Sequence, residues 1–160
     1  MNADCQGCSV AQGELRDVAD VDVLMGAAFD PVFGEAWSKT QLSGMLITPG
    51  SWLLLLRLED KLAGFAIGRS TLDETELMLL AISPDYRRRG LGRKLLNAVI
   101  AEARSRDAQR LFLEMRSDNE TALGLYNDAG FIEVGRRSRY YRGSDGILRD
   151  AITMVLSLRG

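Results

Sequence analysis

The sequence predicts an α/β (α+β) fold in which helices flank a mixed, mostly antiparallel β-sheet. Three observations lead to this fold class. The stretch 77–82 is continuously apolar, as in a strand that is covered on both faces. From Leu91 to Ala103 apolar residues recur at helical spacing, which gives a helix one buried face. Further short runs alternate in polarity or flank tight turns, as in antiparallel hairpins.

The N-terminal half is expected to form two helices and a hairpin after a flexible extension, residues 1–12. Asp17 or Asp20 can cap the first helix, and Ser38 can cap the second. A proline follows each helix and disfavours its continuation. The expected elements are a helix from Asp17 or Asp20 through Phe29, a short helix from Ser38 to Pro49-Gly50, and strands at about 52–58, 63–70 and 76–82.

The C-terminal half is expected to add two helices and three strands to this core. Residues 117–120 have the spacing of a capping box, and Gly130 is a typical helix stop. The expected elements are the helix from Leu91, a strand at 110–116, a helix through Ala129, and strands at 131–134 and 147–158 that are bridged by 136–141 and a turn at 143–146. The expected order is β-α-α-β-β-β-α-β-α-β-β, with no residues assigned to its first strand. No linker or repeat divides the 160 residues, so residues 13–160 are predicted to form a single domain.

A basic loop with two glycines joins the apolar strand to the amphipathic helix. It contains Arg87, Arg88 and Arg89, followed by Gly90 and Gly92. Glycine lets a backbone approach a ligand closely, and the amides at a helix N-terminus point at an anion. Arginine adds positive charge and forked donors for phosphate oxygens. We therefore predict a phosphate-binding loop, with a solvated arginine-rich turn as the alternative.

Two common phosphate loops do not fit this segment. A dinucleotide fingerprint requires a third glycine where Leu95 stands. A Walker A loop requires Gly-Lys-Ser/Thr, but Leu91 and Arg93 follow the two glycines. The ligand is therefore expected to be a phosphate compound of another class.

The composition excludes several kinds of chemistry. The chain has no histidine, so a Ser-His-Asp or Cys-His arrangement and a histidine-ligated zinc site are impossible. The formal net charge of −2 argues against a general nucleic-acid binder, and the apolar runs are far too short to cross a bilayer. We expect no metal, no nucleic acid and no membrane partner. Cys5 and Cys8 lack further ligands, which favours a pair of reduced thiols in the N-terminal extension. The first residues lack the basic and apolar regions of a signal peptide, so a cytoplasmic location is expected.

Two residues could supply acid–base chemistry. Glu114 lies in a strand among apolar neighbours, which would disfavour its ionised form and make it a better base. The alternative is an outward residue that pairs with Arg116 or Arg110. Tyr126 could act as an acid, or it could be a core aromatic whose hydroxyl reaches the surface.

The loop matches the pattern Arg/Gln-x-x-Gly-x-Gly/Ala, with Arg87, Gly90 and Gly92 at the defining positions. In this motif, and in the order of its elements, the chain resembles the GNAT superfamily of acyl-CoA-dependent N-acyltransferases. The stretch 113–119, followed by Leu125-Tyr126 and Gly130-Phe131, is similar to the motif of RimI-type ribosomal-protein-alanine N-acetyltransferases.

Two more segments extend this resemblance. Glu35-Ala36-Trp37-Ser38 is similar to the Pro-Trp-Ser of the RimI type, although Ala36 replaces the proline. Arg139-Tyr140-Tyr141 and the residues after it are similar to the C-terminal hairpin of that type. Only the N-terminal extension with its cysteines falls outside the resemblance.

The resemblance implies a GNAT fold and a role for each matching position. Glu114 would be the general base and Tyr126 the acid, while Trp37, Tyr140 and Tyr141 would line the acceptor groove. Backbone groups of Leu80, Ala81 and Ile82 would bind the pantetheine arm and polarise the thioester. The residues implied to hold acetyl-CoA elsewhere are Arg87, Arg88, Arg89, Gly90, Leu91, Gly92, Arg93 and Asn119. For Asn119 a helix cap is an equally good interpretation.

The function implied is that of a monomeric, cytoplasmic enzyme that moves acetyl directly from acetyl-CoA to a protein N-terminus. By resemblance, the acceptor is the alanine at the N-terminus of small ribosomal subunit protein 18. The alternatives are an acetyltransferase for protein lysine or a small amine, and a module of the same fold that senses acetyl-CoA or scaffolds a partner.

Overall fold

The computed structural model describes residues 7–159, which form one seven-stranded sheet with four α-helices. The strands are β1 (Cys8–Gln12), β2 (Ser51–Leu58), β3 (Lys61–Thr71), β4 (Glu74–Ile82), β5 (Arg110–Arg116), β6 (Ile132–Arg142) and β7 (Leu148–Ser157). The α-helices are α1 (Val18–Ala28), α2 (Lys39–Leu46), α3 (Leu91–Ser105) and α4 (Glu120–Ala129). Short 3₁₀ turns are η1 (Leu15–Asp17), η2 (Pro31–Phe33) and η3 (Pro84–Tyr86).

The strands are arranged in the order β1-β2-β3-β4-β5-β7-β6. Every neighbouring pair is antiparallel except β4 and β5, which run parallel. Parallel neighbours need a long crossover, and α3 supplies it. The predicted mixed, mostly antiparallel sheet is therefore confirmed.

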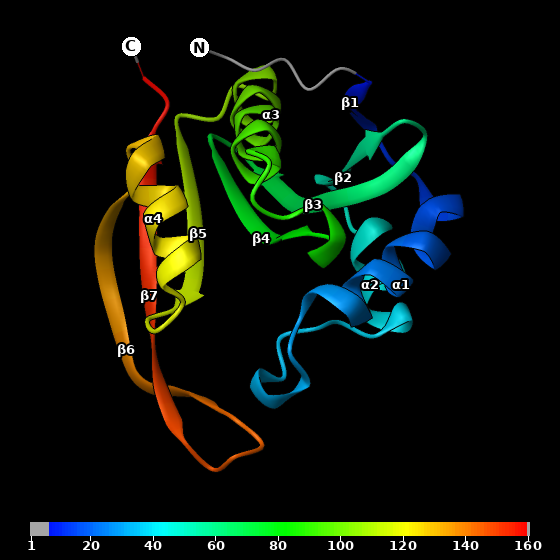
Figure 1. Cartoon of the computed structure of the whole chain (residues 1–160). Coiled ribbons are helices and arrows are strands. Elements are labelled where there is room, and N and C mark those ends of the chain that lie inside the picture. The colour runs from blue at the N-terminus through cyan, green and yellow to red at the C-terminus, as the bar shows by residue number, and fades with distance from the viewer. Residues whose placement is uncertain (1–6, 160) are drawn as a thin grey trace.

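Helices cover the two faces of the sheet unequally. The apolar faces of α3 and α4 pack on one face, where Leu95, Leu96, Leu113 and Met154 are buried. α1 and α2 pack on the other face, but only over the N-terminal half of the sheet, around Phe65. Figure 1 shows α1 and α2 beside β2 and β3, and α4 beside β5 and β7. On the side of α1 and α2, no helix of the described chain packs over β5, β7 and β6, so polar side chains can line that surface.

β4 and β5 pair over only part of their length. Their register runs from Glu74 opposite Arg110 to Leu77 opposite Leu113. At the same point β4 contains a bulge, because Met78 has no partner on β3. A bulge bends and twists its strand. Beyond this point the two strands no longer pair, and Figure 1 shows them diverging; we call this unpaired stretch between β4 and β5 the opening.

Three local expectations are wrong. The extension predicted for residues 1–12 is not an extension throughout, because residues 8–12 form edge strand β1 against β2, while Cys5 lies outside the described residues. Residues 136–141 are not a bridge, because β6 continues through them. Asn119, rather than Ser117, caps α4, and its side chain accepts a hydrogen bond from the Ala122 amide at 3.2 Å.

Other local predictions are confirmed. Ser38 caps α2 through a reciprocal pair of hydrogen bonds with Gln41, and Gly130 ends α4 in the left-handed conformation. The cap predicted for α1 is wrong, however: Asp17 stands at the N-cap position, but its side chain accepts from the Glu14 amide and makes no capping hydrogen bond, and Asp20 lies inside the helix. Among residues 7–159, no helix is long and apolar enough to cross a membrane.

Candidate active site

The predicted phosphate loop lies between β4 and the N-terminus of α3. Arg88 and Gly90 both have positive φ, at 63° and 73°, so the chain turns sharply before Leu91 starts the helix. A Cβ on Gly90 would meet no atom within 4 Å, so this glycine is required by its conformation rather than by local crowding. The first amides of a helix have no partner within it, and such free amides at a helix N-terminus bind anions.

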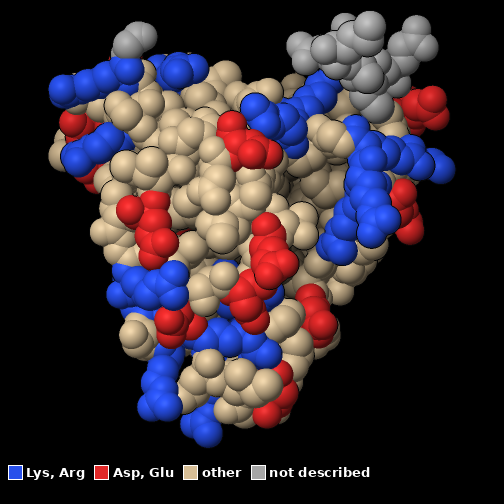
Figure 2. Space-filling view, turned by 60° about the vertical axis from the view of Figure 1, so that its left-hand side comes forward, with Lys and Arg blue, Asp and Glu red and all other residues tan. Residues whose placement is uncertain are grey.

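The arginines of the loop have different surroundings. Arg87 donates hydrogen bonds to the carbonyls of Ile82 and Ala28, and so ties the loop to the end of α1. Arg88, Arg89 and Arg93 are exposed and form no ion pair within residues 7–159, although Arg89 lies over the ring of Tyr86 at 5.5 Å. Figure 2 shows Lys and Arg side chains gathered along one side of the molecule beside a hollow. Arg88, Arg89 and Arg93 are therefore available to an anion, whereas Arg87, although also exposed, is engaged in holding the loop.

The part of β4 that borders the opening ends at Ile82, directly before this loop. Leu80, Ala81 and Ile82 pair with β3 along one edge of β4, and β5 has already diverged from their other edge. An extended chain with amide groups could hydrogen-bond to the free edge in the manner of an added strand.

Glu114 lies on the face of β5 opposite to Leu113 and Met115, which pack into the core under α3 and α4. Its carboxylate is 3.3 Å from Nε of Arg137 on β6, and the hydroxyl of Thr153 on β7 donates to it at 3.5 Å. Arg110 and Arg116, the partners considered from sequence, bind Glu74, Glu35 and Asp118 instead. The surroundings of Glu114 are therefore polar, in contrast to the apolar neighbours expected from sequence.

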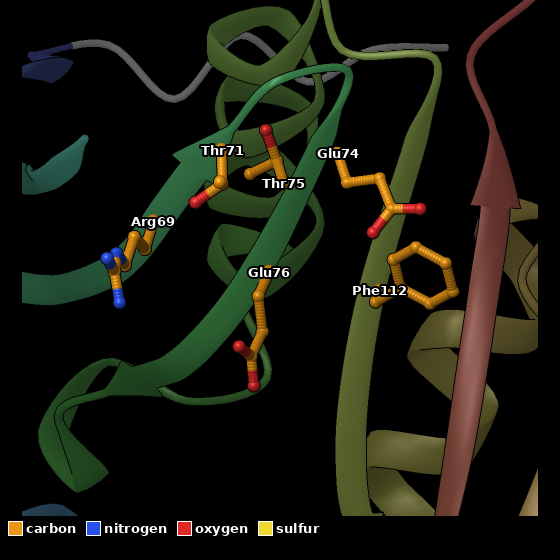
Figure 3. A pocket seen from close by; sticks show the side chains of 6 residues that line it. All are labelled: Arg69, Thr71, Glu74, Thr75, Glu76 and Phe112. Carbon is orange, nitrogen blue, oxygen red and sulfur yellow. The ribbon is translucent and has the colours of Figure 1, made fainter.

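Two adjoining pockets hollow the open face of the sheet around Glu114. One, of about 320 Å³, is lined by Glu76, Phe112, Leu113, Glu114, Arg137, Tyr140 and Thr153. The other, of about 330 Å³, shares Glu76 and Phe112 with it and extends toward the turn between β3 and β4. Figure 3 shows the side chains of this second pocket in front of the sheet, with α3 behind it. Because the two pockets share Glu76 and Phe112, we describe them together as the open groove, one part of which Glu114 lines.

Tyr126 belongs to the opposite side of the sheet. It is buried in the core under α4, where its ring meets Phe131 edge to face at 5.4 Å. Burial raises the pKa of the Tyr126 hydroxyl to about 12, so it stays protonated at neutral pH. The sheet therefore lies between Glu114, which lines the open face, and Tyr126, which is buried in the core under α4.

The three predicted groove residues lie on two segments. Trp37 is half-buried and packs on the core under α1 and α2, just before α2 begins. Tyr140 and Tyr141 on β6 meet edge to face at 5.3 Å, and Tyr140 lies under the Arg137 guanidinium at 4.7 Å. Burial, followed by the nearby carboxylates of Glu114 and Glu35, raises the pKa of Tyr141 to about 12. The structure thus brings Tyr140 to the pocket that Glu114 lines and Tyr141 close to Glu114, whereas Trp37 lines neither pocket.

Sequence reasoning missed Arg137, Thr153 and the role of Arg116. Arg116 is 7% exposed, and its guanidinium binds both Glu35 and Asp118. Burial raises the pKa of Glu35 more than the Arg116 cation lowers it. An arginine at an alternating strand position gives no sign of this burial, because one of its two partners, Glu35, lies 81 residues earlier in the chain.

The comparisons with known proteins agree with this architecture. The sequence model of the Acetyltransferase (GNAT) family matches residues 20–131. A [Ribosomal protein bS18]-alanine N-acetyltransferase of Salmonella typhimurium is 43% identical over 124 residues, which cover 76% of this chain and 81% of that protein. An N-alpha-acetyltransferase RimI of Mycobacterium tuberculosis is 31% identical, over 96% of this chain and 95% of that protein. The crystal structure of the ribosomal-protein-S18-alanine N-acetyltransferase of Escherichia coli superposes with a TM-score of 0.87 at 33% identity, over 96% and 95% of the two chains.

Proposed function

Since the chain belongs to the acetyltransferase (GNAT) family, whose members take their acetyl group from acetyl-CoA, we propose that it acetylates the α-amine of an N-terminal alanine. The proposed acceptor is the N-terminal segment of ribosomal protein bS18, the substrate in the names of the relatives from Salmonella typhimurium and Escherichia coli. We propose further that the enzyme works as a monomer in the cytoplasm, without a metal. The observation that carries the proposal is a carboxylate, Glu114, that lines the open groove and directly follows the last residue of β5 that pairs with β4.

In this scheme the phosphate loop anchors acetyl-CoA. Its pyrophosphate would bind the amides from Gly90 to Arg93, with Arg88, Arg89 and Arg93 as cationic partners. Its pantetheine arm would run along the free edge of β4 at Leu80, Ala81 and Ile82, where a backbone amide can polarise the thioester oxygen. The side-chain oxygen of Asn119 already accepts the capping hydrogen bond of α4. A contact of Asn119 with the thiol end of the cofactor would therefore come from its other polar groups.

The acceptor amine enters from the open face. Glu114 would take a proton from its ammonium group, directly or through water. The neutral amine would then attack the carbonyl carbon of the thioester, forming the C–N bond as the C–S bond breaks. The second amine proton leaves to solvent, and the thiolate of CoA becomes the leaving group. Cys8 lies on β1, away from the residues of this scheme, and an acyl-enzyme is not needed.

Tyr126 would act on the leaving group from the opposite side of the sheet. Its pKa of about 12 lies well above the value of about 8.5 for a thiol, so complete proton transfer to a thiolate is unfavourable. We therefore propose that its hydroxyl donates a hydrogen bond to the departing sulfur, and that solvent supplies the net proton. This role is more modest than that of the general acid expected from sequence.

The chemistry of amines favours an N-terminus over lysine. An α-amine has a pKa of about 7.7–8.0 in peptides and a lysine amine one of about 10.4, so at neutral pH the unprotonated fraction is a few hundredfold larger for the terminus. A single carboxylate base, in a chain without histidine, suits the easier deprotonation. Tyr140, Tyr141 and Trp37 would provide the rigid walls and polar groups that orient the peptide.

The test offers acetyl-CoA and two peptides to the purified protein. One peptide starts with a free alanine, and the other has the same sequence with a blocked N-terminus and an internal lysine. We expect release of free thiol and acetylation of the terminal alanine only, as located by fragmentation in a mass spectrometer. Acetyl on the lysine, or on free small amines alone, would replace the proposal with the corresponding alternative. Binding of acetyl-CoA without turnover would indicate a sensor or scaffold.

A further inference from the structure

A chain of charged groups joins three segments: the end of β5, the segment between α1 and α2, and the hairpin of β6 and β7. Arg116, at the end of β5, binds Glu35 with one nitrogen and Asp118 with another. The other oxygen of Asp118 accepts from Arg149 on β7 at 2.9 Å, and Arg149 also binds Asp145 at 2.8 Å. We call these five side chains, with Phe33, the Arg116 cluster.

Phe33 lies at the centre of the Arg116 cluster. Its ring centroid is 3.4 Å from the Arg116 guanidinium carbon and 4.8 Å from that of Arg149. Both cations therefore lie against one aromatic ring, an arrangement that gains strength when the cations are shielded from water. The Arg116 and Arg149 side chains are only 8% and 13% exposed. The ring and Glu35 both belong to the segment 31–37, between α1 and α2.

A backbone contact supports the same connection. The Ser144 amide, in the turn between β6 and β7, donates to the carbonyl of Val32 at 2.8 Å. The segment 31–37 is consequently held to β5 by Arg116 and to the hairpin of β6 and β7 by Arg149 and Ser144. Trp37 lies at the end of this segment and Tyr140 and Tyr141 lie on the hairpin. The cluster therefore joins the two segments that carry the predicted walls of the acceptor groove.

We propose that Arg116 is a positioning residue for the acceptor. By binding Glu35, Asp118 and Phe33 together, it fixes the segment 31–37 relative to Glu114 and the hairpin. This inference rests on the proposed function, because it assigns the groove at Glu114 to the acceptor amine. Arginine suits the task because its planar group can bind two carboxylates along its edge while its face lies on a ring. A lysine at this position would keep the charge but could not make the three contacts at once.

The test compares matched variants in steady-state kinetics with the alanine peptide and acetyl-CoA. Arg116→Lys removes the fork but keeps the charge, and Phe33→Leu removes the ring. The matched control is Arg110→Lys, at the other end of β5, because Arg110 likewise pairs with a carboxylate, Glu74, and lies over a ring, Phe112. For Arg116→Lys and Phe33→Leu we expect the KM of the peptide to rise at least tenfold and the KM of acetyl-CoA to change less than twofold. Arg110→Lys should alter neither value more than twofold.

Each outcome decides the inference. A peptide KM within twofold of the parent in a folded Arg116→Lys variant would overturn it, as would equal rises in both KM values, which would indicate general loosening. If Arg116→Lys does not fold, the same criteria apply to Phe33→Leu and to Glu35→Gln. If the parent protein does not acetylate the alanine peptide at all, the proposed function fails before the variants are compared. Failure of the inference and failure of the proposed function are thus distinguishable.

Discussion

The Arg137 guanidinium lies 3.3 Å from the Glu114 carboxylate and stacks over Tyr140. A cation therefore already occupies one oxygen of the carboxylate that we propose as the base. An acceptor ammonium that approaches Glu114 must share this carboxylate with Arg137 or displace it. Because the Arg137 side chain is 60% exposed, its hold on Glu114 is expected to be weak.

Arg137→Gln is expected to make the acceptor bind more tightly. An exposed ion pair is worth about 0.2–1 kcal/mol, so removal of the competing cation should lower the KM of the peptide by no more than about fivefold at neutral pH. The effect should diminish as salt rises, since salt screens exposed charges. Steady-state kinetics at two ionic strengths measure both values. A loss of kcat by two orders of magnitude would instead assign Arg137 a direct part in the reaction.

Glu114→Gln is expected to lower kcat by roughly 10²–10⁴-fold while the affinity for acetyl-CoA, measured by calorimetry, stays the same. The deficit should narrow above pH 8, because the α-amine then arrives unprotonated and needs no base. The matched control is Glu76→Gln, a carboxylate of the same pocket on β4 opposite Phe112, and this variant should retain most of its activity. A deficit that is equal at every pH would make Glu114 a positioning residue.

Tyr126→Phe is expected to lower kcat less than Glu114→Gln does, with both KM values nearly unchanged. The substitution removes one hydroxyl and little volume, so the core under α4 should remain packed. The smaller effect follows from the proposed role, since one hydrogen bond to sulfur is lost rather than a complete proton transfer. Normal turnover, or a larger loss than in Glu114→Gln, would contradict this role.

Gly90→Asp is expected to weaken acetyl-CoA binding by several kcal/mol, because it adds a negative charge and disfavours the positive φ at the anion site. Arg88→Ala should have a smaller effect, which shrinks with salt. Calorimetric titration with acetyl-CoA measures both. Arg104→Ala, in the last turn of the same helix, serves as the control for general loss of positive charge. Unchanged affinity in folded Gly90→Asp would remove this loop from the binding site.

The alkaline stability of the protein should depend on Tyr126. Its folded pKa of about 12 lies above the ordinary value of 10.0, so its contribution to stability is complete below pH 10 and is lost as the pH rises through 12. The free energy of unfolding, from urea titrations between pH 9 and 12, should therefore fall less steeply in Tyr126→Phe than in the parent. Equal slopes would mean that the hydroxyl is better solvated than its burial indicates. The pKa of Tyr141 is also raised to about 12, so this residue should make the free energy of unfolding of the parent protein fall more steeply with pH.

The sequence by itself determined most of the local structure and the fold class. Continuous apolar strands, helical spacing, the Ser38 cap and the Gly130 stop are local patterns, and each has the predicted outcome in the structure. The loop before α3 was predictable for the same reason, because glycine at a positive φ and arginine beside a helix N-terminus act within a few residues. Glu114 and Tyr126 were found through family motifs, since nothing in their neighbours alone distinguishes them from surface and core residues.

Only the tertiary structure decided what surrounds these residues. The partners of Glu114 come from β6 and β7, the burial of Arg116 depends on a loop some eighty residues earlier in the chain, and β1 exists because β2 offers it an edge. The opening between β4 and β5 likewise follows from a bulge and from a register that ends at Leu77. Such features arise from pairings between distant segments. Local periodicity carries no information about them, because it reports which face of an element is buried and not which element covers it.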